Sequence, residues 1–229
     1  MNYVWDDIWR NDPYNDPHER RARAQRRLSV MAPWLLPATD LGDVLELGCG
    51  DGSFAGCLAH STGHRIASYT GLDLSPTALD RAQSNVRDPR FHFGLADVSC
   101  VGLPPESADT VLMLGVLEHL PEPSGLLVRL QQVLRPAGRL VLTTSNTLSL
   151  MYAKRRLREA LKLWPYGYQR NYTPLEFRSL LAEYFVELAV IPIHGDWDFP
   201  LVAVLDRAAA WVDADFSRYI LAIAQRKAN

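Results

Sequence analysis

The sequence has no strong charge of either sign. Its 229 residues include 24 Lys and Arg against 26 Asp and Glu, a formal net charge of −2. A protein that holds nucleic acid or an anionic membrane through its overall field needs a basic excess, which is missing here. Nucleic acid is therefore not the expected partner.

Cysteines and long apolar runs are also scarce. The three cysteines, Cys49, Cys57 and Cys100, show no CxxC or Cys/His metal spacing, which indicates reduced thiols. No run approaches the roughly 18–20 apolar residues that span a bilayer. The acidic, aromatic start "MNYVWDDIWRNDPYNDPHERR" lacks the pattern of a signal peptide. We therefore expect a cytoplasmic protein without a transmembrane segment.

Short apolar strands alternate with helical patterns along the chain. The predicted strands are Asp43–Leu47, "RIASYTGLDLS" ending near Asp73, "FHFGLAD", "DTVLMLG", "RLVLTTS", "VELAVIPI" and "SRYILAIAQ". The predicted helices lie between them, and an arginine-rich helix from Pro17 to about Leu36 precedes the first strand. This alternation predicts a parallel sheet covered by helices on both faces, with a ligand at the carboxyl ends of its strands.

Three glycines follow the first predicted strand within five positions, in "DVLELGCGDGSF". Glycine permits positive φ and lets a ligand lie on bare backbone, so Gly48, Gly50 and Gly52 indicate a nucleotide-like ligand. A tight strand-to-helix turn without a ligand is the alternative. In the dinucleotide fingerprint G-x-G-x-x-G the third glycine comes one position later, and here Asp51 would oppose a pyrophosphate. A ligand without phosphate is therefore favoured.

The stretch "VLELGCGDGSF" resembles the first motif of class I S-adenosylmethionine-dependent methyltransferases. Later stretches resemble further motifs of the superfamily in the same order: "GLDLS", "FGLADV", "DTVLMLGVLEHLPEP", "LRPAGRLVLTTSN", with Ala137 for the first glycine of an L-x-P-G-G turn, and "YTPLEFRSLLAEYF". The resemblance covers roughly Leu41 to Phe185. It implies an α/β fold, with a Rossmann-like, seven-stranded, mostly parallel sheet, and S-adenosylmethionine as cofactor, leaving S-adenosylhomocysteine as product.

The implied cofactor-binding residues lie at strand ends. They are Glu46 for the amino group of the methionine moiety, the backbone of Gly48, Cys49 and Gly50, Asp73 for the ribose hydroxyls and Asp97 for the adenine amino group. Leu74, Val98, Leu114 and Gly115 are the remaining expected cofactor-binding residues. A carboxylate can accept hydrogen bonds from both ribose hydroxyls, which suits Asp73. Asp73 could instead cap the helix opened by Ser75, and Glu46 could pair with an arginine.

His119 is the candidate catalytic residue, because it follows the fourth strand and histidine titrates near neutral pH. Packing beneath the Pro121 turn is the alternative role. "GVLEH" also resembles the metal-binding "E-x-x-E-H" of some 2′-O- and ubiquinone O-methyltransferases. Gly115 replaces the first acid of that motif, so we expect Glu118 and His119 to hold no metal. The absence of "[DN]-P-P-[FYW]" after the fourth strand disfavours methylation of a base amine.

Two segments outside the core motifs are expected to cover the site. We predict a helical lid over residues 1–40, a methyltransferase domain over 41–229, and a cap insertion at about 147–172. The aromatic residues in these segments suit an apolar or ring-bearing acceptor: Tyr3, Trp5, Trp9, Trp164, Tyr166, Tyr168 and Tyr172. The cap contains "YAKRRLREALKLW", whose cations we interpret as a solvated face over a buried leucine stripe; membrane or anion binding is the alternative.

The sequence therefore favours methylation of a small molecule, most simply on oxygen. Methyl transfer to nitrogen or carbon, RNA methylation, and a cofactor-binding subunit without activity remain alternatives. The oligomeric state and the identity of the acceptor are left open.

Overall fold

The computed structural model describes residues 3–11, 16–35, 40–62, 65–100, 102–193, 204–205, 208–209, 211 and 213–227. Within these residues seven strands form one sheet in the order β3-β2-β1-β4-β5-β7-β6. The strands are β1 (Gly42–Leu47), β2 (Ile66–Asp73), β3 (Phe91–Leu95), β4 (Ala108–Leu114), β5 (Leu134–Ser145), β6 (Phe185–Ile193) and β7 (Tyr219–Arg226). The helices are α1 (Tyr3–Asn11), α2 (Pro17–Leu35), α3 (Ser53–Thr62), α4 (Pro76–Asn85), α5 (Ser124–Val133), α6 (Leu150–Ala160) and α7 (Pro174–Ala182), with a short 3₁₀ helix η2 (Leu117–His119).

The sheet is mostly parallel, as the sequence predicts. Strand β1 pairs in parallel with β2 and β4, and the parallel pairing continues to β3 on one side and β5 on the other. Only β7, among the described strands, runs against its neighbours β5 and β6. The expected α/β class and seven-stranded, Rossmann-like sheet are confirmed.

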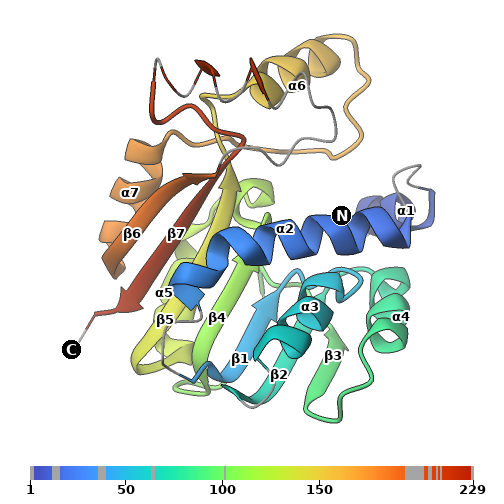
Figure 1. The fold of residues 1–229 in the computed structure, drawn as a ribbon, viewed down its shortest axis with the longest axis vertical. Coiled ribbons are helices and arrows are strands. Elements are labelled where there is room, and N and C mark those ends of the chain that lie inside the picture. Colours follow the sequence, from blue (N-terminus) through green and yellow to red (C-terminus); the bar gives the residue numbers. More distant parts are fainter. Residues whose placement is uncertain are drawn as a thin grey trace.

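Alternation along the strands divides the core into two layers. In β1, Val44 packs on the face covered by α2 and α3, whereas Leu45 and Leu47 pack on the face covered by α5 and α7. Helix α2 crosses the near face of the sheet in Figure 1. Because Glu46 shares the face of Val44, its side chain points beneath the N-terminal helices.

The topology places a crevice between β1 and β4. From β1 the chain moves outward to β2 and β3, and then returns to add β4 on the other side of β1. Ligands of open α/β sheets bind outside the carboxyl ends of the strands at such a reversal. In Figure 1 these ends point towards the top, where α6 stands above the sheet.

The turn Pro136-Ala137-Gly138 lies inside β5, which corrects one predicted boundary. We expected this turn to separate α5 from a strand beginning at Arg139. Instead β5 begins at Leu134, and the pairing with β4 shifts register so that the turn bulges out between Leu134 and Arg139. Ala137 has φ 63°, a left-handed conformation that suits the glycine of the related turn better than an alanine.

Helix α6 also differs from the prediction. It ends at Ala160, and the expected buried leucine stripe is wrong, because Leu157 and Leu161 are 61% and 58% exposed. The buried side chain is Arg155, whose Nη1 donates to the Gln169 carbonyl over 2.5 Å. Arg155 therefore holds α6 against the segment around Gln169.

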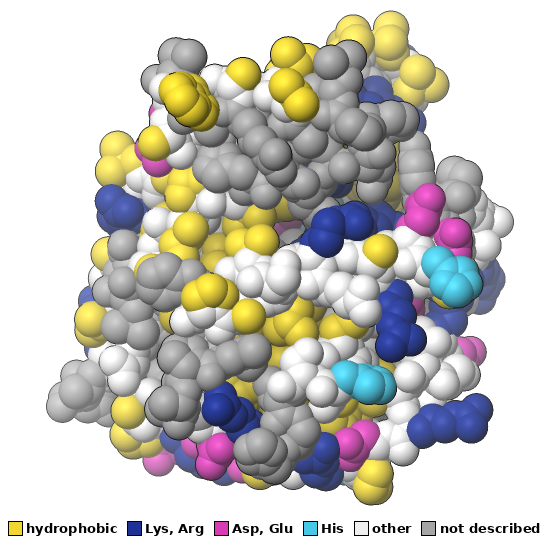
Figure 2. Space-filling view, viewed as in Figure 1, with side chains coloured by type: hydrophobic (Ala, Val, Ile, Leu, Met, Phe, Trp, Pro, Cys, Tyr) yellow, Lys and Arg dark blue, Asp and Glu magenta, His cyan; other side chains and the backbone are white. Residues whose placement is uncertain are grey.

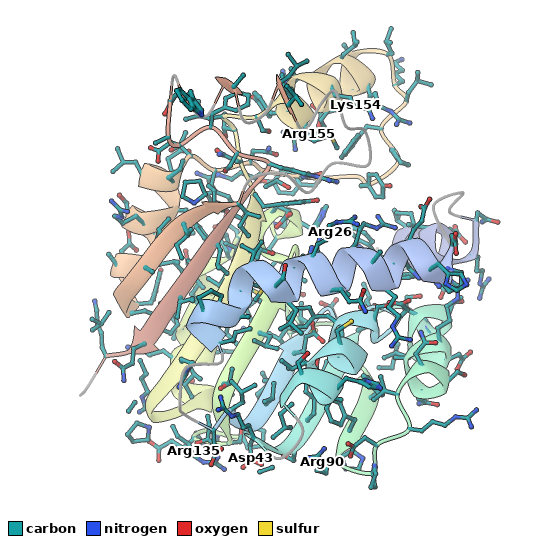
Figure 3. The ribbon with its side chains drawn as sticks, in the orientation of Figure 1. Arg26, Asp43, Arg90, Arg135, Lys154 and Arg155 are labelled. Atoms are coloured by element: carbon teal, nitrogen blue, oxygen red, sulfur yellow. The ribbon has the colours of Figure 1, made fainter. Side chains whose placement is uncertain are left out.

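Ion pairs at the opposite edge of the sheet are structural. Arg135 Nη1 lies 2.9 Å from Asp43 Oδ2 and 2.6 Å from Asp109 Oδ2, which joins the starts of β1, β4 and β5. Figure 3 shows Asp43 and Arg135 at the far end of the molecule from Lys154 and Arg155. These acids are therefore remote from the crevice.

Candidate active site

The glycine loop after β1 is shaped for close approach to its backbone. Gly48 and Gly50 have φ 74° and 54°, which disfavours any residue with a side chain. A β-carbon on Gly48 would overlap Val116 of the loop after β4, and one on Gly50 would lie 2.9 Å from Trp9 Cζ2. The two loops that flank the crevice therefore touch, and the bare backbone between them forms a cradle.

Asp73 fixes this loop from the tip of β2. Its Oδ2 accepts from Gly50 N over 2.8 Å, and its Oδ1 accepts from Ser75 N over 2.9 Å. Burial raises the pKa of Asp73, while these backbone N–H groups work in the opposite direction. Each carboxylate oxygen has a second lone pair, so the expected ribose role and the structural role are compatible.

Glu46 is a buried acid next to the cradle. It is 2% exposed and accepts a hydrogen bond from the Tyr69 hydroxyl, and the positive charge of Arg27 also favours its ionised form. Burial raises the pKa of Glu46 to about 7, the bond from Tyr69 lowers it, and the charge of Asp73 raises it further. A cationic group placed beside it would favour its ionised form.

The other expected cofactor residues lie along the same edge. Cys49 is buried, and burial raises the pKa of its thiol, so it is a packing residue. Leu74 and Val98 are half-buried. Asp97 follows β3, and its Oδ1 accepts from Ser99 N over 2.9 Å and from Ser99 Oγ over 2.6 Å. Strand β3 ends against β2 through a bond from Ala96 N to the Asp73 carbonyl, so Asp97 lies near Asp73.

The end of β4 carries the candidate base and a buried acid. Leu114 is buried, and Gly115 has φ 77°. His119 Nδ1 lies 3.0 Å from the Tyr168 carbonyl oxygen, and because a carbonyl only accepts, Nδ1 is the donor of this bond, so that Nε2 is the acceptor of a neutral imidazole. Glu118 is 3% exposed; its Oε1 accepts from Ser145 Oγ over 3.0 Å, and its Oε2 has no partner among the described residues.

Helix α1 closes one side of this edge. Asp6 Oδ1 accepts from Ser75 Oγ over 2.7 Å and from Thr77 N over 3.0 Å, which ties α1 to the start of α4. Trp9 lies on Gly50 with the guanidinium carbons of Arg20 and Arg81 each 5.9 Å from its ring centroid. The role of Asp6 was not predicted from the sequence, although an acid in an N-terminal aromatic helix was the available signal.

Asp51 also supports the glycine loop. Its Oδ2 accepts from Arg20 Nε over 2.6 Å and from Ser53 Oγ over 2.8 Å, at the start of α3. Asp51 is the acid that argues against a pyrophosphate ligand. It lies at the N-terminus of α3, where a pyrophosphate would bind in a dinucleotide-binding fold. Arg20 of α2 therefore binds the glycine loop through Asp51.

A row of rings continues from α1 to the cap. Trp5 meets His119 edge-to-face at 4.7 Å, Tyr166 lies 6.3 Å from Trp5, and Trp164 lies 4.9 Å from Tyr166. Tyr172 is not part of the row, which corrects its expected place over the pocket. It is 1% exposed and packs in the core against Phe177, 5.9 Å away. The side chain of Tyr3 lies outside the described residues.

The described part of the chain contains neither a cluster of metal ligands nor a membrane-spanning helix. There, no group of three or more His, Cys, Asp or Glu side chains is placed to hold a metal ion. No helix there is long and apolar enough to cross a membrane.

Comparison with known proteins identifies the superfamily. Residues 45–142 match a methyltransferase domain family. The ubiquinone biosynthesis O-methyltransferase of Psychrobacter cryohalolentis is 28% identical over 180 residues, which cover 76% of this chain and 59% of that protein. The chain belongs to the class I S-adenosylmethionine-dependent methyltransferase superfamily.

Two further proteins resemble the chain, one in sequence and one in fold. The 2-methyl-6-phytyl-1,4-hydroquinone methyltransferase of Synechocystis is 28% identical over 155 residues, covering 64% of this chain and 47% of that protein. A solved S-adenosylmethionine-dependent methyltransferase from Mesorhizobium loti superposes with a TM-score of 0.67 at 22% identity, covering 88% of this chain and 98% of that one. The alignments with the Psychrobacter and Synechocystis proteins cover about half of the length of each of these relatives.

The site fits the cofactor of the superfamily, which is S-adenosylmethionine. The left-handed backbone of Gly48 and Gly50 carries no side chain, and Val116 and Trp9 lie against it from the neighbouring elements. The acids Glu46 and Asp73 flank it, and the chemistry of both suits a ligand with an ammonium group and two ribose hydroxyls.

Proposed function

We propose that the chain transfers a methyl group from S-adenosylmethionine to a hydroxyl oxygen of a small, ring-bearing acceptor, with His119 as the general base. The observation that carries the proposal is the tautomer of His119. The bond from Nδ1 to the Tyr168 carbonyl leaves Nε2 as a proton acceptor at the end of β4. Two relatives named for ubiquinone biosynthesis and for a hydroquinone substrate support a ring-bearing hydroxyl compound as the acceptor class.

Each expected cofactor residue has a place in this proposal. The backbone of Gly48, Cys49 and Gly50 would hold the methionine moiety, with Glu46 beside its ammonium group. Asp73 and Leu74 would hold the ribose, Asp97 and Val98 the adenine, and Leu114 and Gly115 would line the floor of the crevice. When bound, the cofactor supplies an electrophilic methyl group on a sulfonium.

The chain's own groups then position and deprotonate the acceptor. His119 Nε2 would take the hydroxyl proton as the oxygen attacks, which is where a positioned base helps a methyl transfer. The rings of Trp5, Trp164 and Tyr166 would sandwich or border a flat acceptor. Glu118 Oε2, a buried acceptor without a described partner, would receive a hydrogen bond from a second hydroxyl.

We further infer that residues 1–40 act as a lid and that residues 147–172 act as a cap. The contacts of Asp6 with the start of α4 and of Trp9 with Gly50 support closure by α1 over the cofactor side. The contact of Trp5 with His119 supports closure over the acceptor side. Exclusion of water would favour transfer to the acceptor over hydrolysis.

The test is methyl transfer from labelled S-adenosylmethionine to a panel of catechols and hydroquinones, followed by location of the label on oxygen, nitrogen or carbon. We expect O-methylation that persists in EDTA. His119→Ala should lower turnover by about 10²–10⁴, the range for a positioned base, with little change in S-adenosylhomocysteine affinity. The matched control is His92→Ala, an exposed histidine on β3.

Several results would contradict the proposal. Wild-type turnover in His119→Ala would assign the base elsewhere. Activity lost in EDTA and restored by magnesium would make Glu118 and His119 metal ligands. Label on nitrogen, carbon or RNA would select one of the alternative acceptors, and binding without turnover on any acceptor would favour a subunit without activity.

A further inference from the structure

Helix α6 presents its leucines to solvent. Leu150, Leu157 and Leu161 recur at helical spacing along one side, and they are 37%, 61% and 58% exposed. Leu163, just beyond the helix, is 59% exposed. Lys154 is exposed on the same side, between Leu150 and Leu157. We call this set, with Lys162, the cap face.

The contacts of α6 explain why this side is turned outward. Arg155, on another side, is buried, donates to the Gln169 carbonyl and lies over the Tyr152 ring at 5.3 Å. Glu159 lies 3.6 Å from Arg155 Nε and 3.0 Å from Arg156 Nη1. These polar contacts hold the helix by the side opposite to its leucines, so the exposure of the leucines follows from fixed packing.

The charge of this segment is opposite to that of the chain. Residues 150–163 contain five Lys or Arg side chains and one acid, Glu159, in a chain with a formal net charge of −2. The acid is engaged with Arg155 and Arg156. The exposed leucines are therefore surrounded by positive charge.

The cap face also lies at one extremity of the molecule. Figure 1 shows α6 at the top, beyond the carboxyl ends of the strands, and the described pieces of residues 204–211 reach the same end. Yellow side chains gather along this upper rim in Figure 2. Trp211 in these pieces is 93% exposed, and Val204 and Leu205 are 60% and 52% exposed.

We propose that the cap face docks the protein on the surface of an anionic lipid bilayer. Leucines at a protruding tip can enter the boundary between headgroups and acyl chains, while neighbouring lysines and arginines meet lipid phosphates. The basic charge around the leucines selects an anionic surface over a neutral one. The proposal does not depend on methyl transfer, and its test uses no activity.

The experiment is flotation of the full chain with phosphatidylcholine vesicles that contain or lack phosphatidylglycerol. We expect flotation with the anionic vesicles only, weakened by added salt. The combined variant Leu157→Gln, Leu161→Gln and Leu163→Gln should remain at the bottom of the gradient. The matched control is Leu175→Gln on α7, which removes a leucine that is 69% exposed elsewhere and should float like the wild type.

A second pair of variants tests the charge. Lys154→Gln with Lys162→Gln should weaken partitioning by about fivefold for each cation removed, the effect of roughly 1 kcal/mol per basic side chain near an anionic surface. Arg87→Gln, at an exposed arginine after α4, should leave it unchanged. Unchanged S-adenosylhomocysteine affinity in every variant would show that they fold.

Three outcomes would overturn the proposal. The first is wild-type protein that does not float with anionic vesicles. The second is a loss in Leu175→Gln as large as that in the triple variant. The third is a concentration-dependent dimer in sedimentation experiments that the triple variant abolishes, which would make a second copy of the chain the occupant of the cap face.

Discussion

The raised pKa of Glu46 leads us to expect that cofactor binding depends on pH. Burial raises its pKa to about 7, so much of the free protein carries a neutral Glu46 near neutral pH. A ligand ammonium group beside it favours the ionised form, and binding below the pKa then requires release of a proton. Affinity should therefore fall as pH falls through 7.

The size of the effect follows from the fraction of Glu46 that is ionised. About a tenth is ionised one pH unit below the pKa and about nine tenths one unit above it, so S-adenosylhomocysteine should bind roughly tenfold more weakly near pH 6 than near pH 8. Titration calorimetry at both pH values measures this ratio. Glu46→Gln should bind weakly with a flat profile. 5′-Methylthioadenosine, which lacks the amino acid, should bind the wild type with a flat profile.

The raised pKa of Glu46 also affects stability. Whereas cofactor affinity should rise with pH, the free energy of unfolding should fall with pH. Since the folded pKa lies above the ordinary value of 4.5, the unfolded chain ionises Glu46 first as pH rises. The free energy of unfolding of the cofactor-free protein should lose up to about 3 kcal/mol between pH 4.5 and 7 from this group. The reasoning is refuted if S-adenosylhomocysteine affinity is the same at both pH values, or if Glu46→Gln retains the wild-type slope.

Two further predictions concern the lid and the turn in β5. Trp9→Ala should weaken S-adenosylhomocysteine binding by about 1–2 kcal/mol in calorimetry, which is the scale of a lost aromatic contact. The control Val4→Ala, on the exposed side of α1, should leave the affinity unchanged. Equal affinities of the two variants would show that α1 does not contribute to the cofactor site. Ala137→Gly should raise the free energy of unfolding in urea by several tenths to about 1 kcal/mol, because glycine adopts φ 63° without steric strain. The control Ala153→Gly, inside α6, should lower the free energy of unfolding by about 1 kcal/mol. A destabilised Ala137→Gly variant would show that the turn carries no strain.

The sheet was predictable because its signals are local. Strands β1, β2 and β4 are short apolar runs bounded by glycine, proline or acid residues, and Ser75 caps the helix that it was expected to open. The carboxyl edge also follows from strand order, since the implied cofactor residues lie at or just beyond the carboxyl ends of strands. These features require no knowledge of distant contacts.

Long-range contacts account for most of what the sequence did not show. Asp6 meets Ser75 across 69 positions, and no local pattern indicates that an N-terminal helix would fasten itself there. The spacing of Leu157 and Leu161 places both leucines on one side of a helix. It does not show that the side carrying Arg155 is the one that is buried. Tyr172 and Tyr166 are both aromatic residues of the segment 147–172, and only packing against Phe177 separates the core residue from the half-buried row.

The most direct test of the account is calorimetry of S-adenosylhomocysteine with the wild type and with Asp73→Ala, with NAD titrated in parallel. The account predicts binding of S-adenosylhomocysteine, no binding of NAD, and a loss of about 1–3 kcal/mol in the folded variant, the range for hydrogen bonds to a charged group. Binding of NAD without S-adenosylhomocysteine, or an unchanged dissociation constant in Asp73→Ala, would contradict it.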